Sequence, residues 1–243
     1  MLFSPSSRSV RLAFLVLMFQ LCAANAVAQD HFNEKGSGPS SVTSQLQAEL
    51  RSSLPFDDQR DFEESRRGFI AEPDSRQILA ANGRVVWDMT RYDFLLEGRE
   101  YDSIHPSLQR QATLNMNFGL YEIVPDFMYQ VRGFDVANMT LVKGDSGWIL
   151  FDVLLTSETA AAALALANEQ LGELPVRAVV YSHSHSDHFG GVRGVIIEQD
   201  VQSGLVQVIA PSGFMEEAIA ENVYAGNAMS RRAGLQFGRG IPS

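Results

Sequence analysis

Residues 176–191 read VRAVVYSHSHSDHFGG, and this stretch decides the fold. Its first part, residues 176–181, is an apolar run of the kind found in buried strands. The run leads directly into a loop that holds three of the five histidines of the chain and one carboxylate. Gly190 and Gly191 follow, and because they lack a Cβ the backbone can turn away tightly. Four ligand-type residues directly after a buried strand predict a metal site anchored on a sheet.

The spacing of the ligands predicts two metal positions. Histidines at i and i+2 on an extended backbone point the same way, so His183 and His185 are expected to bind one cation. Asp187 and His188 send a carboxylate and an imidazole toward a second. Zinc accepts these donors, and in two-metal sites the ions lie about 3.5 to 4 Å apart with a hydroxide between them. Iron and manganese accept the same donors. Asp187 is expected to be a ligand or to orient the attacking water.

The residues before the loop predict a sheet and a helix. Apolar segments at 127–131, 138–142 and 148–152 predict strands, and the turn residues 143–147 make the last two an antiparallel hairpin. The alanine- and leucine-rich segment 157–171 predicts a helix that ends before a glycine. A strand, a helix and a second strand therefore lead to the histidine loop.

Further upstream the pattern predicts three smaller elements. Short strands flank the Asn82-Gly83 turn, a strong hairpin signal. Residues 107–120 show helical spacing of apolar residues after a proline. Residues 29–56 are polar and rich in serine and glycine, so we expect a mobile lead-in with one short helix near Leu46.

The first 28 residues predict a signal peptide. Arg8 and Arg11 precede the apolar stretch 12–21, and small residues fit cleavage after Ala26 or Ala28. The apolar stretch is too short to cross a bilayer. We therefore expect a periplasmic or secreted chain that has no membrane contact after cleavage.

Composition excludes several classes of function. The 243 residues include 19 lysines and arginines against 29 acidic residues, a net charge of -10, so a nucleic-acid partner is not expected. Cys22 is the only cysteine and lies in the signal peptide, which leaves no disulfide or thiol chemistry. A metal site must then use histidine, aspartate and glutamate.

The run His-x-His-x-Asp-His followed by two glycines resembles the metal signature of the metallo-β-lactamase superfamily. Longer strings around it resemble one branch, the secreted alkyl sulfatases of the SDS-hydrolase type. The resemblance covers residues 60–238. It rests on the strings YQVRGFD at 129–135, NMT at 138–140, APSGFM at 210–215 and ENVYAGNAM at 221–229.

The resemblance implies a fold, a metal cofactor and an incomplete set of metal ligands in this sequence. The fold would be an α/β αββα sandwich, with residues 57–243 forming the N-terminal part of the catalytic domain, so the sandwich is expected to be incomplete. Two zinc ions would be bound, the first by His183 and His185 and the second by Asp187 and His188. The family completes both sites with two later carboxylates and a later histidine, but no histidine follows His188. Glu216, Glu217 and Glu221 lie in a helical-looking stretch and match none of those positions.

The implied reaction is hydrolysis of alkyl sulfate esters, such as dodecyl sulfate, to an alcohol and inorganic sulfate by a metal-bound hydroxide. Substrate contacts are expected at four residues inside the matching strings, each of which could instead be structural: Arg132, Asn138, Tyr224 and Asn227. The full-length family is expected to form homodimers. Two alternatives stay open, namely another hydrolase of the superfamily, such as a β-lactamase or lactonase, and a truncated, inactive metal-binding fragment.

Overall fold

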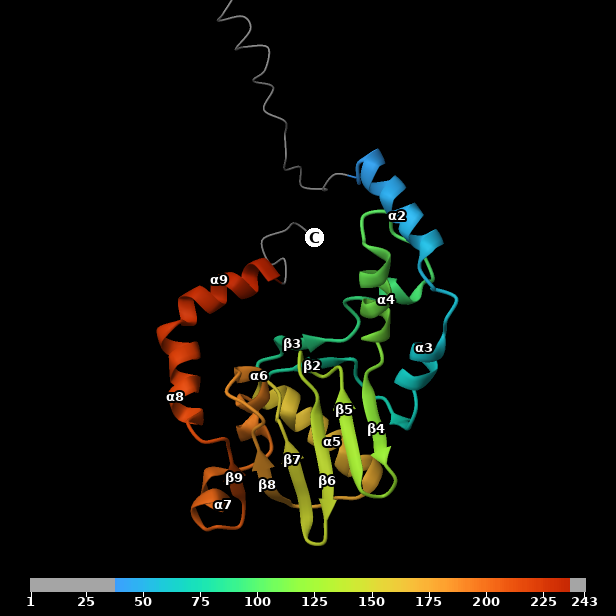
Figure 1. The fold of residues 1–243 in the computed structure, drawn as a ribbon. Coiled ribbons are helices and arrows are strands. Elements are labelled where there is room, and N and C mark those ends of the chain that lie inside the picture. Colours follow the sequence, from blue (N-terminus) through green and yellow to red (C-terminus); the bar gives the residue numbers. More distant parts are fainter. Residues whose placement is uncertain (1–37, 237–243) are drawn as a thin grey trace, which may run out of the picture. The chain divides into compact units, whose positions relative to one another are not determined.

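The computed structural model describes residues 38–236 (Figure 1). The predicted signal peptide, residues 1–28, lies outside the described residues. Seven strands form one mixed sheet in the order β1-β4-β5-β6-β7-β8-β9. Their bounds are Phe69–Ala71 (β1), Gly119–Val124 (β4), Met128–Arg132 (β5), Met139–Gly144 (β6), Gly147–Phe151 (β7), Val176–Val180 (β8) and Gln207–Ile209 (β9). Neighbouring strands are antiparallel from β1 to β7, whereas β7, β8 and β9 are parallel.

Helices and a small hairpin complete the described part of the chain. The hairpin pairs β2 (Gln77–Leu79) with β3 (Val85–Asp88). The helices are α2 (Ser41–Ser53), α3 (Arg60–Ser65), α4 (Pro106–Leu114), α5 (Ser157–Leu171), α6 (Ser186–Phe189), α7 (Glu198–Gln202), α8 (Phe214–Ile219) and α9 (Gly226–Gln236). Shorter helical segments are η1 (Asp93–Leu96), η2 (Val192–Gly194) and η3 (Ala220–Tyr224), the last of which is a π-helix. None of the helices described is long and apolar enough to span a membrane.

The mixed α/β class, the hairpin around Asn82-Gly83 and the antiparallel strands β5 to β7 confirm the sequence predictions. The predicted helix 157–171 has the bounds of α5, which begins at a capping box made by Thr156 and Thr159. Two helix predictions were wrong in extent. The helix near Leu46 is the 13-residue α2. The helix predicted over 107–120 ends at Leu114, because the following residues enter β4 and pair with β5.

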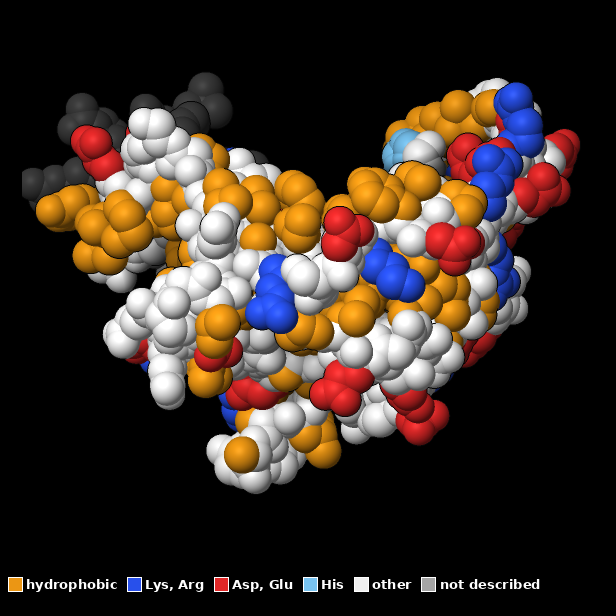
Figure 2. All heavy atoms as spheres, turned by 90° about the horizontal axis from the view of Figure 1, so that it is seen from below, with side chains coloured by type: hydrophobic (Ala, Val, Ile, Leu, Met, Phe, Trp, Pro, Cys, Tyr) orange, Lys and Arg blue, Asp and Glu red, His pale blue; other side chains and the backbone are white. Residues whose placement is uncertain are grey.

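The core lies on one face of the sheet, under α5. Trp148, Leu141 and Leu150 are fully buried, and Ala163 and Ala167 of α5 belong to the same cluster of buried side chains. Alternating residues of β5 and β6 are only half-buried, so within residues 38–236 one sheet face is covered more completely than the other. This is the arrangement expected of one half of a sandwich. On the face seen in Figure 2, acidic and basic side chains are interspersed with hydrophobic ones.

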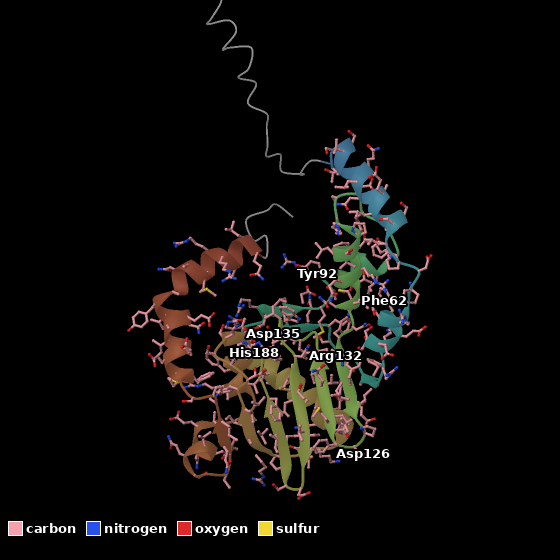
Figure 3. The ribbon with its side chains drawn as sticks, in the orientation of Figure 1. Phe62, Tyr92, Asp126, Arg132, Asp135 and His188 are labelled. Carbon is pink, nitrogen blue, oxygen red and sulfur yellow. The ribbon has the colours of Figure 1, made fainter. Side chains whose placement is uncertain are left out.

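Strand directions bring four chain segments to the same end of the sheet. Because β5 and β6 are antiparallel and β7 and β8 are parallel, the end of β5, the start of β6 and the ends of β7 and β8 share one edge. Asp135 and His188 both lie at this end (Figure 3). The histidine loop therefore begins where two other loops of the sheet also gather.

Asp135 ties two of these loops together. It is buried, and its carboxylate accepts hydrogen bonds from the backbone N–H of Val136 at 2.6 Å, from that of Leu155 at 3.0 Å and from the Thr159 hydroxyl at 2.8 Å. The carboxylate thus fixes the β7–α5 loop against the end of β5.

Replacing Asp135 by asparagine is expected to lower the free energy of unfolding by about 2 kcal/mol, because the amide NH₂ would face buried donors that then lack an acceptor. Urea unfolding followed by circular dichroism measures this. The matched variant is Asp145→Asn, at an exposed position of the β6–β7 turn, and it is expected to leave stability unchanged. Equal stability of the two variants would contradict the role given to Asp135.

Candidate metal centre

The histidine loop is held by the loop that follows β7. Beyond β8, the backbone N–H of Tyr181 donates to Ile209 O at 2.9 Å and extends the pairing with β9. The chain then bends into the four-residue helix α6. Two backbone hydrogen bonds attach this turn to the β7–α5 loop, from Val153 N to His188 O and from Gly191 N to Leu154 O, each 2.9 Å long. The position of the loop is therefore set by the sheet and by α5.

The three histidine rings of the loop lie together. The ring centroids of His183 and His185 are 4.5 Å apart, and those of His183 and His188 are 4.0 Å apart. The two histidines predicted to bind one cation, His183 and His185, thus lie side by side. The ring of His183 therefore contacts both of the other imidazoles at the end of β8.

Asp152, which directly follows β7, fixes two of the imidazoles. One carboxylate oxygen lies 2.8 Å from His188 Nδ1, and the same oxygen accepts the Ser182 hydroxyl hydrogen at 2.7 Å. Ser182 Oγ in turn lies 2.8 Å from His183 Nδ1. Since the carboxylate only accepts and the hydroxyl hydrogen is already used, both Nδ1 atoms must donate. The Nε2 atoms of His183 and His188 are left with lone pairs, as in histidines that bind metals.

Asp187 and Glu221 place carboxylates beside two of these rings. Asp187 Oδ2 lies 3.4 Å from His188 Nε2, and Glu221 Oε1 lies 3.1 Å from His185 Nε2. Glu221 reaches the loop from η3. Asp187 and His188, which are adjacent in sequence, thus lie in contact. The approach of Glu221 was not predicted.

The donors fit zinc in kind. Zinc–nitrogen bonds of about 2.0 to 2.1 Å and zinc–oxygen bonds of about 2.0 to 2.2 Å put neighbouring ligand atoms about 2.9 to 3.4 Å apart at angles of about 90 to 110 degrees. The two nitrogen–oxygen separations, 3.1 and 3.4 Å, fall within this interval. A direct histidine–carboxylate contact has the same separation, so the donors fit zinc in kind while their spacing is that of an ordinary ion pair.

The donors do not form a complete cage. Within residues 38–236, no three side chains of His, Cys, Asp or Glu are arranged so that they could hold one ion together. A pair of donors binds zinc weakly, because structural and catalytic sites use three or four protein ligands. The described residues thus hold pairs of donors but no complete metal site.

The four predicted substrate contacts are not gathered at the histidines. The Arg132 guanidinium donates to Gln130 at 2.7 Å and to Ser65 O at 3.1 Å, and it lies 4.2 Å from the centre of the Tyr121 ring. This is a structural role. Asn138 is exposed at the start of β6, and the two remaining candidates are exposed on η3 and α9, namely Tyr224 and Asn227. No contact tests their proposed role in substrate binding.

Sequence reasoning missed Asp152 and Glu221. Asp152 lies at a strand end, and its φ of +56° is uncommon for a residue other than glycine. Such strain often marks a functional position, but the sequence does not show it. The sequence pattern placed Glu221 in a helix, and its position matched none of the metal-ligand positions that the family resemblance implies. Both residues are distant from the loop along the chain, so only the fold brings them to it.

An apolar cavity of about 510 Å³ lies beside the loop. Tyr181, which precedes the histidines, and Phe214 line it, and Phe189, which follows them, packs against both rings at centroid distances of 5.9 and 5.2 Å. Burial raises the pKa of the Tyr181 phenol because the phenolate would lose its hydration. The aromatic residues on both sides of the histidines thus pack with a ring that lines this apolar space.

Comparison with known proteins agrees with this arrangement. A family model described as the metallo-beta-lactamase superfamily matches residues 132–241, which include the whole histidine loop. This part of the chain is therefore similar to the metallo-β-lactamase superfamily. Individual proteins narrow this similarity, since the histidine run is shared by hydrolases of several kinds.

Several proteins to which the chain is similar are named as sulfatases. An (R)-specific secondary-alkylsulfatase from a Pseudomonas species is 53% identical over 203 residues, 84% of the chain and 30% of the relative. An alkyl/aryl-sulfatase from Saccharomyces cerevisiae is 48% identical over 82% of the chain and 30% of the relative. A solved structure of a stereoselective inverting sec-alkylsulfatase from Pseudomonas superposes with a TM-score of 0.81 at 51% identity, and the match covers 87% of the chain and 33% of that structure. The chain thus spans about a third of the length of these relatives.

Proposed function

We propose that this chain carries the histidine part of a zinc-dependent alkyl sulfatase site, which hydrolyses alkyl sulfate esters to an alcohol and inorganic sulfate. The observation that carries the proposal is the cluster of three imidazoles, two of them fixed through Asp152 so that Nε2 is left for a metal. The relatives named for alkyl sulfate hydrolysis supply the reaction class.

The residues of the chain have distinct tasks in this proposal. His183 and His185 hold one zinc ion, and Asp187 and His188 hold the other. When bound, zinc supplies Lewis acidity toward the sulfate oxygens and lowers the pKa of water. Asp187, with its carboxylate beside His188, also orients the attacking water. Asp152 keeps the imidazoles in the tautomer that binds metal.

The apolar cavity beside Tyr181 supports an alkyl substrate. A sulfate ester joins an anionic head to an apolar tail, so its site must offer cations at one end and an apolar surface at the other. The cavity offers such a surface, and Tyr181 connects it to the loop. We assign the tail of the ester to this cavity and its sulfate to the zinc ions.

The test is sulfate release from 2-octyl sulfate and decyl sulfate by the purified chain, first stripped with a chelator and then loaded with zinc. Circular dichroism in the presence of each detergent-like substrate verifies that the chain stays folded. Zinc-dependent sulfate release is expected. A β-lactam and a lactone are assayed in parallel.

Three results would reject the proposal. Hydrolysis of the β-lactam or the lactone without sulfate release would identify another superfamily hydrolase. Zinc binding without any turnover would identify an inactive metal-binding fragment. Sulfate release that survives chelation would exclude a role for the metal.

We also propose that the chain is exported, on the basis of the signal peptide in its sequence. Fractionation of expressing bacterial cells tests this, with N-terminal sequencing of the product. Export with cleavage after Ala26 or Ala28 is expected, and an uncleaved cytoplasmic product would reject the proposal.

A further inference from the structure

A second cavity, of about 500 Å³, lies between α5 and the strand β2. Ile78 and Leu79 of β2 line one wall, and Phe134, which follows β5, adds to the same apolar surface. The other wall is α5, where Ala162 and Ala165 leave room that larger side chains would fill. Leu79 lines the cavity and is 52% exposed. The cavity therefore offers a ligand an apolar surface and has the volume of a small-molecule site.

The charges around this cavity are all of one sign. Glu158 and Glu169 of α5 and Asp74, which precedes β2, line it, and no basic side chain of residues 38–236 does. In the same part of the chain, none of the three carboxylates forms an ion pair. Unpaired carboxylates around an apolar surface are complementary to a ligand that is cationic and partly apolar.

The two glutamates lie near opposite ends of the α5 wall. Their positions, 158 and 169, are eleven residues apart, which is close to three helical turns. They therefore share one face of the helix and are separated by about 16.5 Å along its axis. Ala162 and Ala165 lie between them and line the same cavity. The wall thus has a negative charge at each end and an apolar middle.

Glu169 occupies a position where the helix itself disfavours an acid. It lies in the last turn of α5, which contains no basic residue. The carboxyl end of a helix carries a partial negative charge, so a carboxylate there is repelled and a cation is attracted. Glu158 lies in the first turn, where an acid is favoured. A cation bound at Glu169 would therefore be attracted both by the carboxylate and by the end of the helix.

We propose that this cavity binds a linear organic cation with an ammonium group at each end and an apolar chain between them. One ammonium pairs with Glu169 and the other with Glu158, while the chain lies over Ala162 and Ala165 and contacts Leu79. Asp74 adds negative charge from the opposite wall. The site is separate from the proposed sulfatase site, because no residue of the histidine loop, 183–191, lines it and because its ligand has the opposite charge.

The experiment is calorimetric titration of 1,12-diaminododecane into the full chain, compared with dodecylamine and 1,4-diaminobutane. Dodecylamine has one ammonium group, and 1,4-diaminobutane is too short to reach both glutamates. We expect the long diamine to bind about fivefold more tightly than dodecylamine, which is the upper end of what one partly exposed ion pair contributes. We expect the short diamine to bind more weakly than the long one.

Two variants test the two parts of the site. Ala165→Leu fills the cavity without a change of charge, and leucine is a strong helix former, so α5 is expected to persist while the long diamine binds at least about tenfold more weakly. Glu169→Gln is expected to remove the preference for the diamine over dodecylamine. The matched controls are Gln170→Leu on α5 and Glu173→Gln beyond it. Both residues are exposed and outside the cavity lining, so neither change is expected to affect binding.

Unchanged binding of the long diamine by Ala165→Leu would overturn the proposal, as would equal affinities of the parent chain for the diamine and dodecylamine. Equal weakening by Glu173→Gln and Glu169→Gln would attribute the effect to net charge and would also reject it. Circular dichroism verifies that each variant is folded, and Ala162→Leu serves in place of Ala165→Leu should that variant not fold. These titrations contain no sulfate ester, so their outcome is independent of the proposed activity.

Discussion

Replacing Gly191 by alanine is expected to lower the free energy of unfolding by about 3 kcal/mol, the upper end of the usual cost of overpacking. A Cβ at this position would come within 2.8 Å of three atoms, namely the carbonyl oxygens of Val153 and Thr156 and the Cβ of Ala160. Two of these are backbone atoms of the segment that joins β7 to α5, and they cannot move without disturbing the start of α5. Urea unfolding followed by circular dichroism measures the change.

The same substitution is expected to weaken zinc binding, because Gly191 N donates to Leu154 O and so attaches the histidine loop to its support. The matched control is Gly234→Ala in α9, where a Cβ would meet nothing within 4 Å. Alanine suits a helix interior better than glycine, so this variant is expected to gain about 0.5 to 1 kcal/mol. A Gly191→Ala chain as stable as the parent would show that the loop is not packed as described.

Local patterns were sufficient to predict much of the fold. The strands β5 to β8 follow from apolar runs and turn residues, and α5 follows from its composition and cap, because these signals are contained in a few neighbouring residues. The helix predicted over 107–120 was too long because the pairing of β4 with β5 overrides local helical spacing. The position of the histidine loop at a strand end was predictable for the same local reason.

The surroundings of the histidines could not be predicted in this way. Asp152 reaches Ser182 and His188 only because β7 and β8 are adjacent and parallel, so their ends coincide. The aspartate that supports the site therefore comes from another strand. Glu221 depends on a π-turn, for which the sequence carries no visible signal. The histidine loop thus follows from the sequence, while the residues that contact its imidazoles follow from the fold.

Replacing Asp152 by asparagine is expected to reduce zinc affinity about 10- to 100-fold, the range found when a group that supports a metal-binding histidine is changed. The carboxylate receives three donors, from Ser182 N, the Ser182 hydroxyl and His188 Nδ1. An amide has one accepting oxygen and presents NH₂ in place of the other, so at least one of these donors loses its partner. The tautomers of His183 and His188 are then no longer fixed, and Nε2 becomes the protonated nitrogen in part of the molecules.

Asparagine is chosen because it tolerates the left-handed backbone of Asp152, so the substitution tests hydrogen bonding and not backbone strain.

Asp126→Asn is the matched control. Asp126 has the same φ of +56° but is exposed at the opposite end of the sheet from His188 (Figure 3). It is expected to leave zinc binding unchanged in the same titration. Ser182→Ala removes the hydroxyl that links Asp152 to His183 but leaves the contact of Asp152 with His188, so its zinc affinity is expected to fall between those of the parent and of Asp152→Asn. Equal affinities of Asp152→Asn and the parent would mean that the imidazoles are oriented by the metal itself, and not by the carboxylate at the end of β7.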